Sequence, residues 1–298
     1  MINIPSAVRA LRPKQWTKNA VVFAAFLFAL GDRQQHVGLS GFWTSLQAAF
    51  LFCLVSSGVY LMNDVRDVDQ DRAHPTKKLR PVAAGELSPR FASLMAAVLL
   101  AAGLAGTWWM SLELFYVVGG YVALQIAYTF ALKHIALIDL FVIAGGFVLR
   151  ALAGAVALQV TISPWLLLCA LLLALFLALC KRRHERVVLN DALGETRKSL
   201  EYYDEPLLDQ LIAVVSAATL VCYALYTLWP DTVQKFGTAR LGLTIPFVIF
   251  GIFRYLDLVY RHEKGGQPEL ILLTDIPLLA DLALYGLTVV LILVFKSA

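Results

Sequence analysis

Long apolar runs alternate with short polar segments along the sequence. A helix needs about 20 predominantly apolar residues to cross a bilayer, and about nine runs approach that length. Transmembrane β-strands would show shorter segments of alternating hydrophobicity instead. The pattern therefore predicts an all-α polytopic membrane protein with about nine transmembrane helices. The expected spans are residues 16–31, 39–62, 89–110, 113–132, 137–158, 164–181, 206–229, 239–260 and 275–296.

The composition agrees with a membrane protein. Of the 298 residues, 59% are hydrophobic and only 15% are charged, and the mean hydropathy is +0.72, which is far from the usual mix of a soluble domain. The polar and basic segment 1–18 has no apolar core of its own, so we expect no cleavable signal peptide. We expect one transmembrane domain over residues 1–298, with polar loops at about 63–88 and 182–205.

Basic residues gather in alternate connections between the expected spans. One group precedes the first span, and further groups follow the second, fourth, sixth and eighth spans, whereas the opposite connections carry little positive charge. Cytoplasmic loops of membrane proteins are enriched in Lys and Arg. The distribution therefore predicts a cytoplasmic N-terminus and places the long polar loops on the same side of the membrane.

An acidic segment, residues 60–72, follows the second expected span and contains four aspartates. On a helix that turns by about 100° per residue, Asp64, Asp67 and Asp71 share one face, whereas Asp69 points roughly the other way. Carboxylates crowded on one face repel each other unless a cation lies among them, and such hard oxygen ligands suit Mg²⁺. The segment indicates a divalent-metal site, although a solvated acidic helix end would give the same pattern.

A basic segment continues the sixth expected span into the cytoplasm. In this segment Lys181 and Glu185 lie on one helix face, with Arg182 and Arg186 beside them. An Mg²⁺-binding acidic cluster and a basic cluster on the same side of the membrane suit a diphosphate, since metal and basic side chains can share its oxygens. Topology alone also explains basic residues at a cytoplasmic helix end.

Two ionisable residues, Asp139 and Arg150, lie inside the fifth expected span. Such residues are energetically unfavourable in lipid and usually line a cavity or pair with each other. These two are roughly 16 Å apart along a helix, which is too far for a direct pair. Each is therefore expected to have another partner or to contact water in a cavity.

The sequence resembles the UbiA superfamily of intramembrane prenyltransferases. The resemblance rests on the motif Asn63-Asp64-x-x-Asp67-x-x-x-Asp71 after the second span, and it extends over essentially the whole chain. Most aromatic prenyltransferases of this superfamily carry a second acidic motif, DxxxD, after the sixth span, where this chain has Lys181-Arg-Arg-His-Glu185. That departure resembles the phosphoribosyltransferase branch, as do the segments 12–19, 78–81, 149–154 and 265–269.

The resemblance implies a helix bundle with a polar chamber facing the cytoplasm of a bacterial inner membrane. It implies that 5-phosphoribosyl 1-diphosphate is the donor and that a polyprenyl phosphate, such as decaprenyl phosphate, is the acceptor, in the synthesis of a cell-wall arabinan precursor. No nucleic-acid partner is expected. By the same resemblance the Mg²⁺ ligands are Asp64, Asp67, Asp71 and Asn63, and the catalytic residues are these three aspartates and Lys181. The implied substrate-binding residues are Lys14, Asn63, Tyr60, Lys77, Arg80, Lys133, Arg182 and Glu185.

Two other functions fit part of the pattern. An aromatic or haem-type prenyltransferase would use a prenyl diphosphate and is expected to carry the second DxxxD motif, but Asp204 and Asp209 have the wrong spacing for it. A lipid or small-molecule transporter would distribute ionisable residues through the depth of the membrane, whereas here they gather at one face, apart from Asp139 and Arg150.

Overall fold

A computed structural model describes residues 6–32, 35, 37–74, 76–189, 202–262, 265–266 and 268–295. Within these ranges all regular secondary structure is helical, which confirms the predicted all-α class. The elements in chain order are α1 (Ser6–Ala10), η1 (Pro13–Phe23), α2 (Ala24–Leu30), α3 (Ser40–Arg66), α4 (Val68–Ala73), η2 (Lys77–Leu79), α5 (Pro89–Met110), α6 (Leu112–Phe130), η3 (Leu132–His134), α7 (Ile138–Ala157), α8 (Pro164–Leu189), α10 (Glu205–Leu228), α11 (Pro230–Phe236), η4 (Arg240–Thr244), α12 (Ile245–Tyr260), α13 (Pro268–Thr274) and α14 (Ile276–Val294).

Eight helical segments in the described part of the chain are long and apolar enough to cross a membrane, so the protein is a multi-pass membrane protein. They correspond to the second to ninth expected spans. The first expected span, 16–31, instead forms the 3₁₀ helix η1 followed by the short helix α2. The 11 residues of η1 exceed the usual 3₁₀ length of about 3–4 residues. An apolar window cannot distinguish this arrangement from one continuous α-helix.

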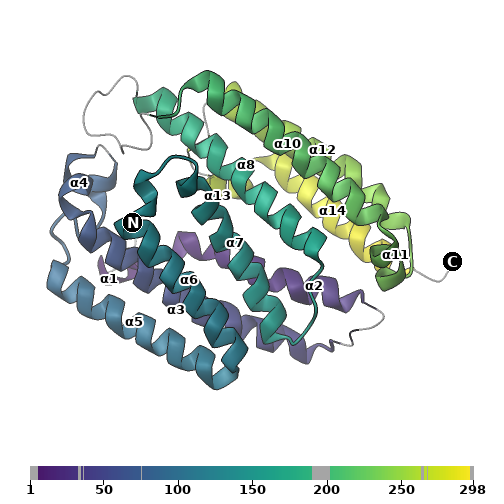
Figure 1. The fold of residues 1–298 in the computed structure, drawn as a ribbon, viewed down its shortest axis with the longest axis horizontal. Helices are drawn as coiled ribbons and strands as arrows, with labels where there is room; N and C mark the ends of the chain where they lie inside the picture. The colour runs from purple at the N-terminus through teal and green to yellow at the C-terminus, as the bar shows by residue number, and fades with distance from the viewer. Residues whose placement is uncertain are drawn as a thin grey trace. The chain divides into compact units, whose positions relative to one another are not determined.

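The contacts divide the chain into two compact units. The first comprises Met1–Phe26, Leu39–Val142 and Leu149–Thr161. In it α3 packs along α5, and α6 contacts both (Figure 1). The α3·α5 contact is close because glycines face larger side chains: a Cβ on Gly103 would collide with Val55. Small residues are the usual means of close helix packing in membranes.

A buried arginine in the core of this first unit contacts residues of several helices. Arg150 of α7 is only 4% exposed, and its Nε donates to Asn19 Oδ1 at 2.8 Å while Nη2 donates to Tyr121 OH at 3.0 Å. Its guanidinium also lies over the rings of Phe52 and Tyr121. This confirms the expectation that Arg150 has partners other than Asp139, and it links α7 to η1 and α6.

The second unit comprises Leu27–Gly38, Ile143–Val148 and Ile162–Ala298. Here α8 packs along α10, and α12 packs along α14 (Figure 1). A buried cluster of Tyr226, Phe236, Leu241 and Ile292 joins α10, α11, η4 and α14. Of the expected polar loop 182–205, residues 190–201 lie outside the described part of the chain.

Candidate metal and phosphate site

The acidic segment forms the end of α3 and the short helix α4. α3 ends at Arg66, and Asp67 has φ −99° and ψ 14° before α4 begins at Val68. Helical hydrogen bonds still cross this break, because the Asp67 amide donates to Asn63 O at 2.9 Å and the Asp71 amide donates to Asp67 O at 2.8 Å. The break is therefore shallow, and the predicted facing of the aspartates is largely preserved.

Burial separates the aspartates as the helical pattern predicts. Asp64 is 1% exposed and Asp71 is 3% exposed, whereas the side chain of Asp69 is 88% exposed and pairs with Arg72. The side chain of Asp67 is 12% exposed. The three aspartates among the predicted metal ligands thus lie inward, so their carboxylates are not those of a solvated helix end.

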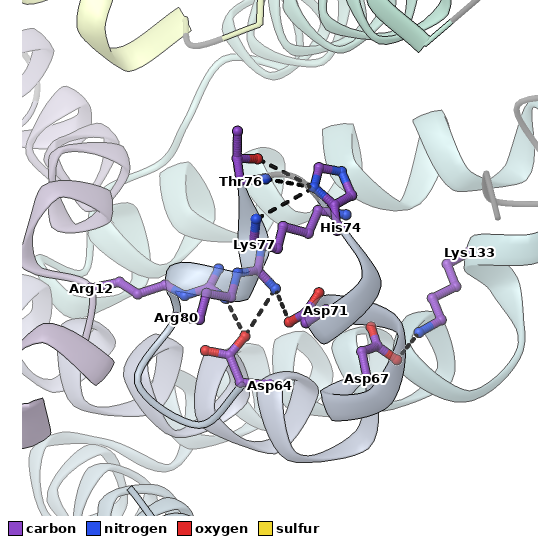
Figure 2. Close-up of polar contacts among 9 residues, drawn as sticks. All are labelled: Arg12, Asp64, Asp67, Asp71, His74, Thr76, Lys77, Arg80 and Lys133. Carbon is purple, nitrogen blue, oxygen red and sulfur yellow. Dashed lines mark hydrogen bonds and ion pairs between the residues drawn. The ribbon is translucent and has the colours of Figure 1, made fainter. Parts of the chain in front are cut away.

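Arg80 joins two of these carboxylates (Figure 2). Its Nη1 donates to Asp71 Oδ2 at 2.6 Å and to Asp64 Oδ1 at 3.2 Å. The loop that carries Arg80 is shaped locally: His74 Nδ1 accepts the amide of Thr76 at 3.2 Å, and the Arg80 amide closes η2 by donating to Lys77 O at 2.9 Å. Two buried carboxylates this close require a shared cation, and Arg80 occupies that shared position.

Arg12 contacts Asp64 from the N-terminal segment. Its Nη2 donates to Asp64 Oδ1, and its guanidinium lies 5.1 Å from the centre of the Tyr60 ring. The Arg12 backbone is left-handed, with φ 54° and ψ 60°, which is unfavourable by roughly 1–2 kcal/mol for a residue other than glycine. Pro13 disfavours a right-handed helical conformation at the preceding residue. Burial lowers the pKa of the Arg12 guanidinium, whereas the charge of Asp64 acts to raise that pKa.

Lys133 neutralises the remaining aspartate. It lies in η3, is 4% exposed, and its Nζ donates to Asp67 Oδ1 at 2.6 Å (Figure 2). Lys133 follows the fourth expected span, whereas the acidic segment follows the second. The ion pair between Lys133 and Asp67 is therefore a tertiary contact, which the sequence alone does not predict.

Most of the predicted site residues of the first unit lie in these two groups of contacts. Tyr60, Asp64, Asp71 and Arg80 belong to the network of Arg12, and Asp67 pairs with Lys133. Asn63 directly precedes Asp64, and Lys77 is the half-buried first residue of η2. Lys14 is exposed in η1, and its ammonium forms no ion pair with another described residue.

Arg12 was not among the predicted site residues. Two signals were available: Arg12 begins the segment 12–19 that carries part of the resemblance, and it belongs to the basic group before the first span, for which topology was a sufficient explanation. Only the left-handed backbone and the contact with Asp64 distinguish Arg12 from neighbouring basic residues, and neither can be read from the spacing.

The remaining predicted residues lie on α8, in the second unit. Arg182 is 3% exposed and its Nη1 donates to Glu185 Oε2, while Lys181 is half-buried. Two nearby acids have structural partners: Asp204 caps the start of α10, and Asp209 accepts from Arg183 at 2.6 Å. The substrate-binding roles of Lys181, Arg182 and Glu185 remain predictions.

The arrangement of the three carboxylates determines whether they fit a metal ion. In the described residues no group of three or more His, Cys, Asp or Glu side chains is arranged to bind a metal ion. Asp64 and Asp71 do converge on one cationic position, and Asp64 Oδ2 is buried without a hydrogen-bond partner among those residues. A buried carboxylate oxygen without a donor is unfavourable and suits a cation. These two residues therefore fit Mg²⁺, while Asp67 remains a predicted ligand that would have to leave Lys133.

Comparison with known proteins bears on the family and the fold. The model of the UbiA prenyltransferase family matches residues 19–265. The decaprenyl-phosphate phosphoribosyltransferase of Mycolicibacterium smegmatis is 38% identical over 281 residues, which are 91% of this chain and 87% of the relative. The enzyme of the same name from Mycobacterium tuberculosis is 38% identical over 272 residues, covering 91% and 89%. A UbiA homologue from Archaeoglobus fulgidus bound to GPP and Mg²⁺ has the same fold, with a TM-score of 0.72, 21% identity and coverage of 95% and 97%.

Proposed function

The chain belongs to the UbiA prenyltransferase family, and we propose that it transfers 5-phosphoribose from 5-phosphoribosyl 1-diphosphate to a polyprenyl phosphate, such as decaprenyl phosphate, with release of diphosphate. The observation that carries this proposal is 38% identity, over about nine-tenths of the chain, to relatives named for that reaction. The basic segment in place of a second acidic motif supports the same choice, since a sugar phosphate donor and a lipid phosphate both bring negative charge.

The proposed reaction is a substitution at C1 of the ribose. The bond between C1 and the diphosphate oxygen breaks with oxocarbenium character, its electron pair leaves with diphosphate, and an oxygen of the lipid phosphate forms the new bond to C1. That oxygen is already anionic near neutral pH, so the reaction needs no strong general base. The main tasks of the protein are therefore to bind, orient and neutralise the phosphates.

The acidic segment is proposed to bind the metal that the diphosphate needs. Asp64 and Asp71 would bind Mg²⁺, with Asp67 and Asn63 as further ligands. Bound Mg²⁺ neutralises the charge that builds on a leaving diphosphate. Asp64 Oδ2 is buried and has no hydrogen-bond partner among the described residues, which supports this assignment.

Basic side chains are proposed to bind the phosphate groups. Arg80 and Lys133 already contact the acidic segment, so they are suited to the diphosphate and the 5-phosphate. The other proposed phosphate ligands are Lys14, Lys77, Lys181 and Arg182, while Tyr60 and Glu185 are proposed to contact the sugar or to orient these cations.

We further propose that residues 1–298 act as one domain in a bacterial inner membrane, with the N-terminus and the site on the cytoplasmic side. The alternating basic connections support this orientation. The product would then serve as a lipid-linked pentose precursor for cell-wall arabinan.

The experiment incubates the purified protein in detergent with Mg²⁺, ribose-labelled 5-phosphoribosyl 1-diphosphate and decaprenyl phosphate. Label should pass into the organic phase only when the lipid is present, and it should not do so with an Asp71→Asn variant. A parallel reaction supplies a prenyl diphosphate and an aromatic acid. Absence of lipid-borne label, with turnover in the parallel reaction, would reject the proposal in favour of an aromatic prenyltransferase.

A further inference from the structure

The charged groups around the acidic segment balance each other. Three carboxylates contact three cationic side chains, so their formal charges cancel (Figure 2). The ion pairs are Arg12 with Asp64, Arg80 with Asp64 and Asp71, and Lys133 with Asp67. A divalent cation that enters alone therefore meets no net negative charge among these six side chains.

A metal ion at Asp64 and Asp71 would also compete with a guanidinium. Arg80 Nη1 lies within 3.2 Å of both carboxylates, in the position that a shared cation would take. If Mg²⁺ took the place of the Arg80 guanidinium, the two positive charges of the metal would replace one, and the buried cluster would carry excess positive charge, which is unfavourable. A diphosphate that arrives with the metal removes the excess and offers new acceptors to the displaced arginine.

The two arginines and Asp64 differ in how far their side chains are exposed. The side chains of Arg12 and Arg80 are 22% and 25% exposed, whereas that of Asp64 is 1% exposed. The two arginines therefore have solvent on one side and can rotate towards an incoming anion, while the carboxylates stay buried.

The backbone around Arg12 is fixed, which confines the motion to the side chain. Ser57 of α3 donates to Leu11 O at 3.0 Å and accepts from Trp16 Nε1 at 3.0 Å. These contacts hold both flanks of the left-handed Arg12 against the helix that carries Asp64. The strained residue is thus anchored with its guanidinium at the site, as is common where backbone strain serves function.

We propose that Arg12 and Arg80 are phosphate ligands that neutralise Asp64 and Asp71 until substrate arrives, and that Mg²⁺ and the diphosphate enter the site together. Both arginines then exchange from the carboxylates to the diphosphate. This assigns a substrate-binding role to Arg12. The identity of the donor rests on the proposed function. The exchange itself requires only a diphosphate group, whichever molecule carries that group.

The test measures Mg²⁺ binding to the detergent-purified protein by calorimetry, with and without inorganic diphosphate and without lipid. The wild type should bind Mg²⁺ weakly alone and about tenfold or more tightly with diphosphate, in the range of typical coupling between ligands. Arg80→Gln and Arg12→Gln should bind Mg²⁺ alone more tightly than the wild type and should lose most of the gain from diphosphate. Arg72→Gln removes the same charge from an exposed pair with Asp69 and should behave as the wild type.

Folding is monitored in parallel by the thermal midpoint of each variant with Mg²⁺ alone, which should rise more for Arg80→Gln than for the wild type. Equal Mg²⁺ affinity of the wild type with and without diphosphate, unchanged by either substitution, would overturn the exchange. Because no lipid or ribose is present, this result is independent of the transfer assay. Strong coupling without phosphoribosyl transfer would reject the proposed function alone.

Discussion

Arg150 on α7 donates a 2.8 Å hydrogen bond to Asn19 in η1, across 131 positions of sequence. The contact joins a buried cation to the same 3₁₀ helix that begins directly after Arg12. η1 therefore contacts the core of the first unit through Asn19 and directly follows Arg12, which contacts the acidic segment.

Arg150→Lys should destabilise the protein and reduce transfer together. Lysine keeps the charge but cannot donate to both Asn19 and Tyr121 in the fixed geometry of a guanidinium, nor lie as a plane over the ring of Phe52. Loss of these contacts is expected to lower stability by about 1–3 kcal/mol. The measurement is the thermal midpoint in detergent with the transfer rate on the same sample, and an unchanged midpoint would contradict the role of Arg150.

Gly154→Ala tests the close approach of η1 to α7. A Cβ at Gly154 would collide with the backbone carbonyl of Val22, which has no flexible end to move aside. We expect a loss of about 1–3 kcal/mol, as for other overpacked positions. The matched control is Gly120→Ala on α6, where a Cβ would meet no other described residue within 4 Å outside its own stretch of helix. If both variants melt at the same temperature, η1 is not packed against α7 as described.

Replacing the inward aspartates should abolish transfer. Asp64→Asn and Asp71→Asn each remove a charge from the proposed metal site without changing volume, and we expect activity to fall by about 100-fold or more, a typical effect for electrostatic groups at an active site. Asp69→Asn changes an exposed carboxylate in the same segment and should stay within about twofold of the wild type. Near-normal activity of Asp64→Asn would show that the buried carboxylate has a structural role only.

Lys133 and Asp67 should be energetically coupled. Lys133→Met leaves the carboxylate of Asp67 in a largely buried position without this ammonium, so the single variant should be destabilised by about 3–5 kcal/mol. Adding Asp67→Asn should recover part of that loss, since the uncompensated charge is gone. A double-mutant cycle on thermal or denaturant unfolding measures the coupling, and additive effects would indicate that the two residues act independently.

Periodicity predicted the parts of the molecule that depend on local sequence. The apolar runs gave the second to ninth spans, and a turn of about 100° per residue separated Asp69 from Asp64 and Asp71. The 3₁₀ form of η1 was not predicted, because hydropathy does not distinguish a 3₁₀ helix from an α-helix, and the contacts of η1 with Gly154 and Arg150 of α7 are tertiary.

At the site, too, local sequence predicted some features, whereas others depend on tertiary packing. Arg80 and Lys133 were named from the resemblance, but their pairing with particular aspartates depends on the loops η2 and η3, whose shape arises from turns and tertiary contacts. Arg12 lies in the segment 12–19 that carries part of the resemblance, but no residue pattern there predicts its left-handed backbone or its contact with Asp64. Local patterns thus predict which groups are present, and packing decides which of them meet.

Lys181, in the basic segment on α8, can contribute to membrane topology, to phosphate binding or to both, and a substitution distinguishes these roles. If Lys181 binds a substrate phosphate, Lys181→Ala should leave the thermal midpoint and the membrane orientation unchanged and reduce transfer by about 100-fold. Arg261→Ala is the matched control: it removes a positive charge from another expected cytoplasmic connection, at a side chain that is 82% exposed. Orientation is read from the labelling of an introduced N-terminal cysteine by a membrane-impermeant reagent, in intact cells and after lysis. Equal activity of the two variants would assign Lys181 to topology alone, whereas loss confined to Lys181→Ala would place it among the phosphate ligands, as the replacement of the second acidic motif by Lys181-Arg-Arg-His-Glu185 leads us to expect.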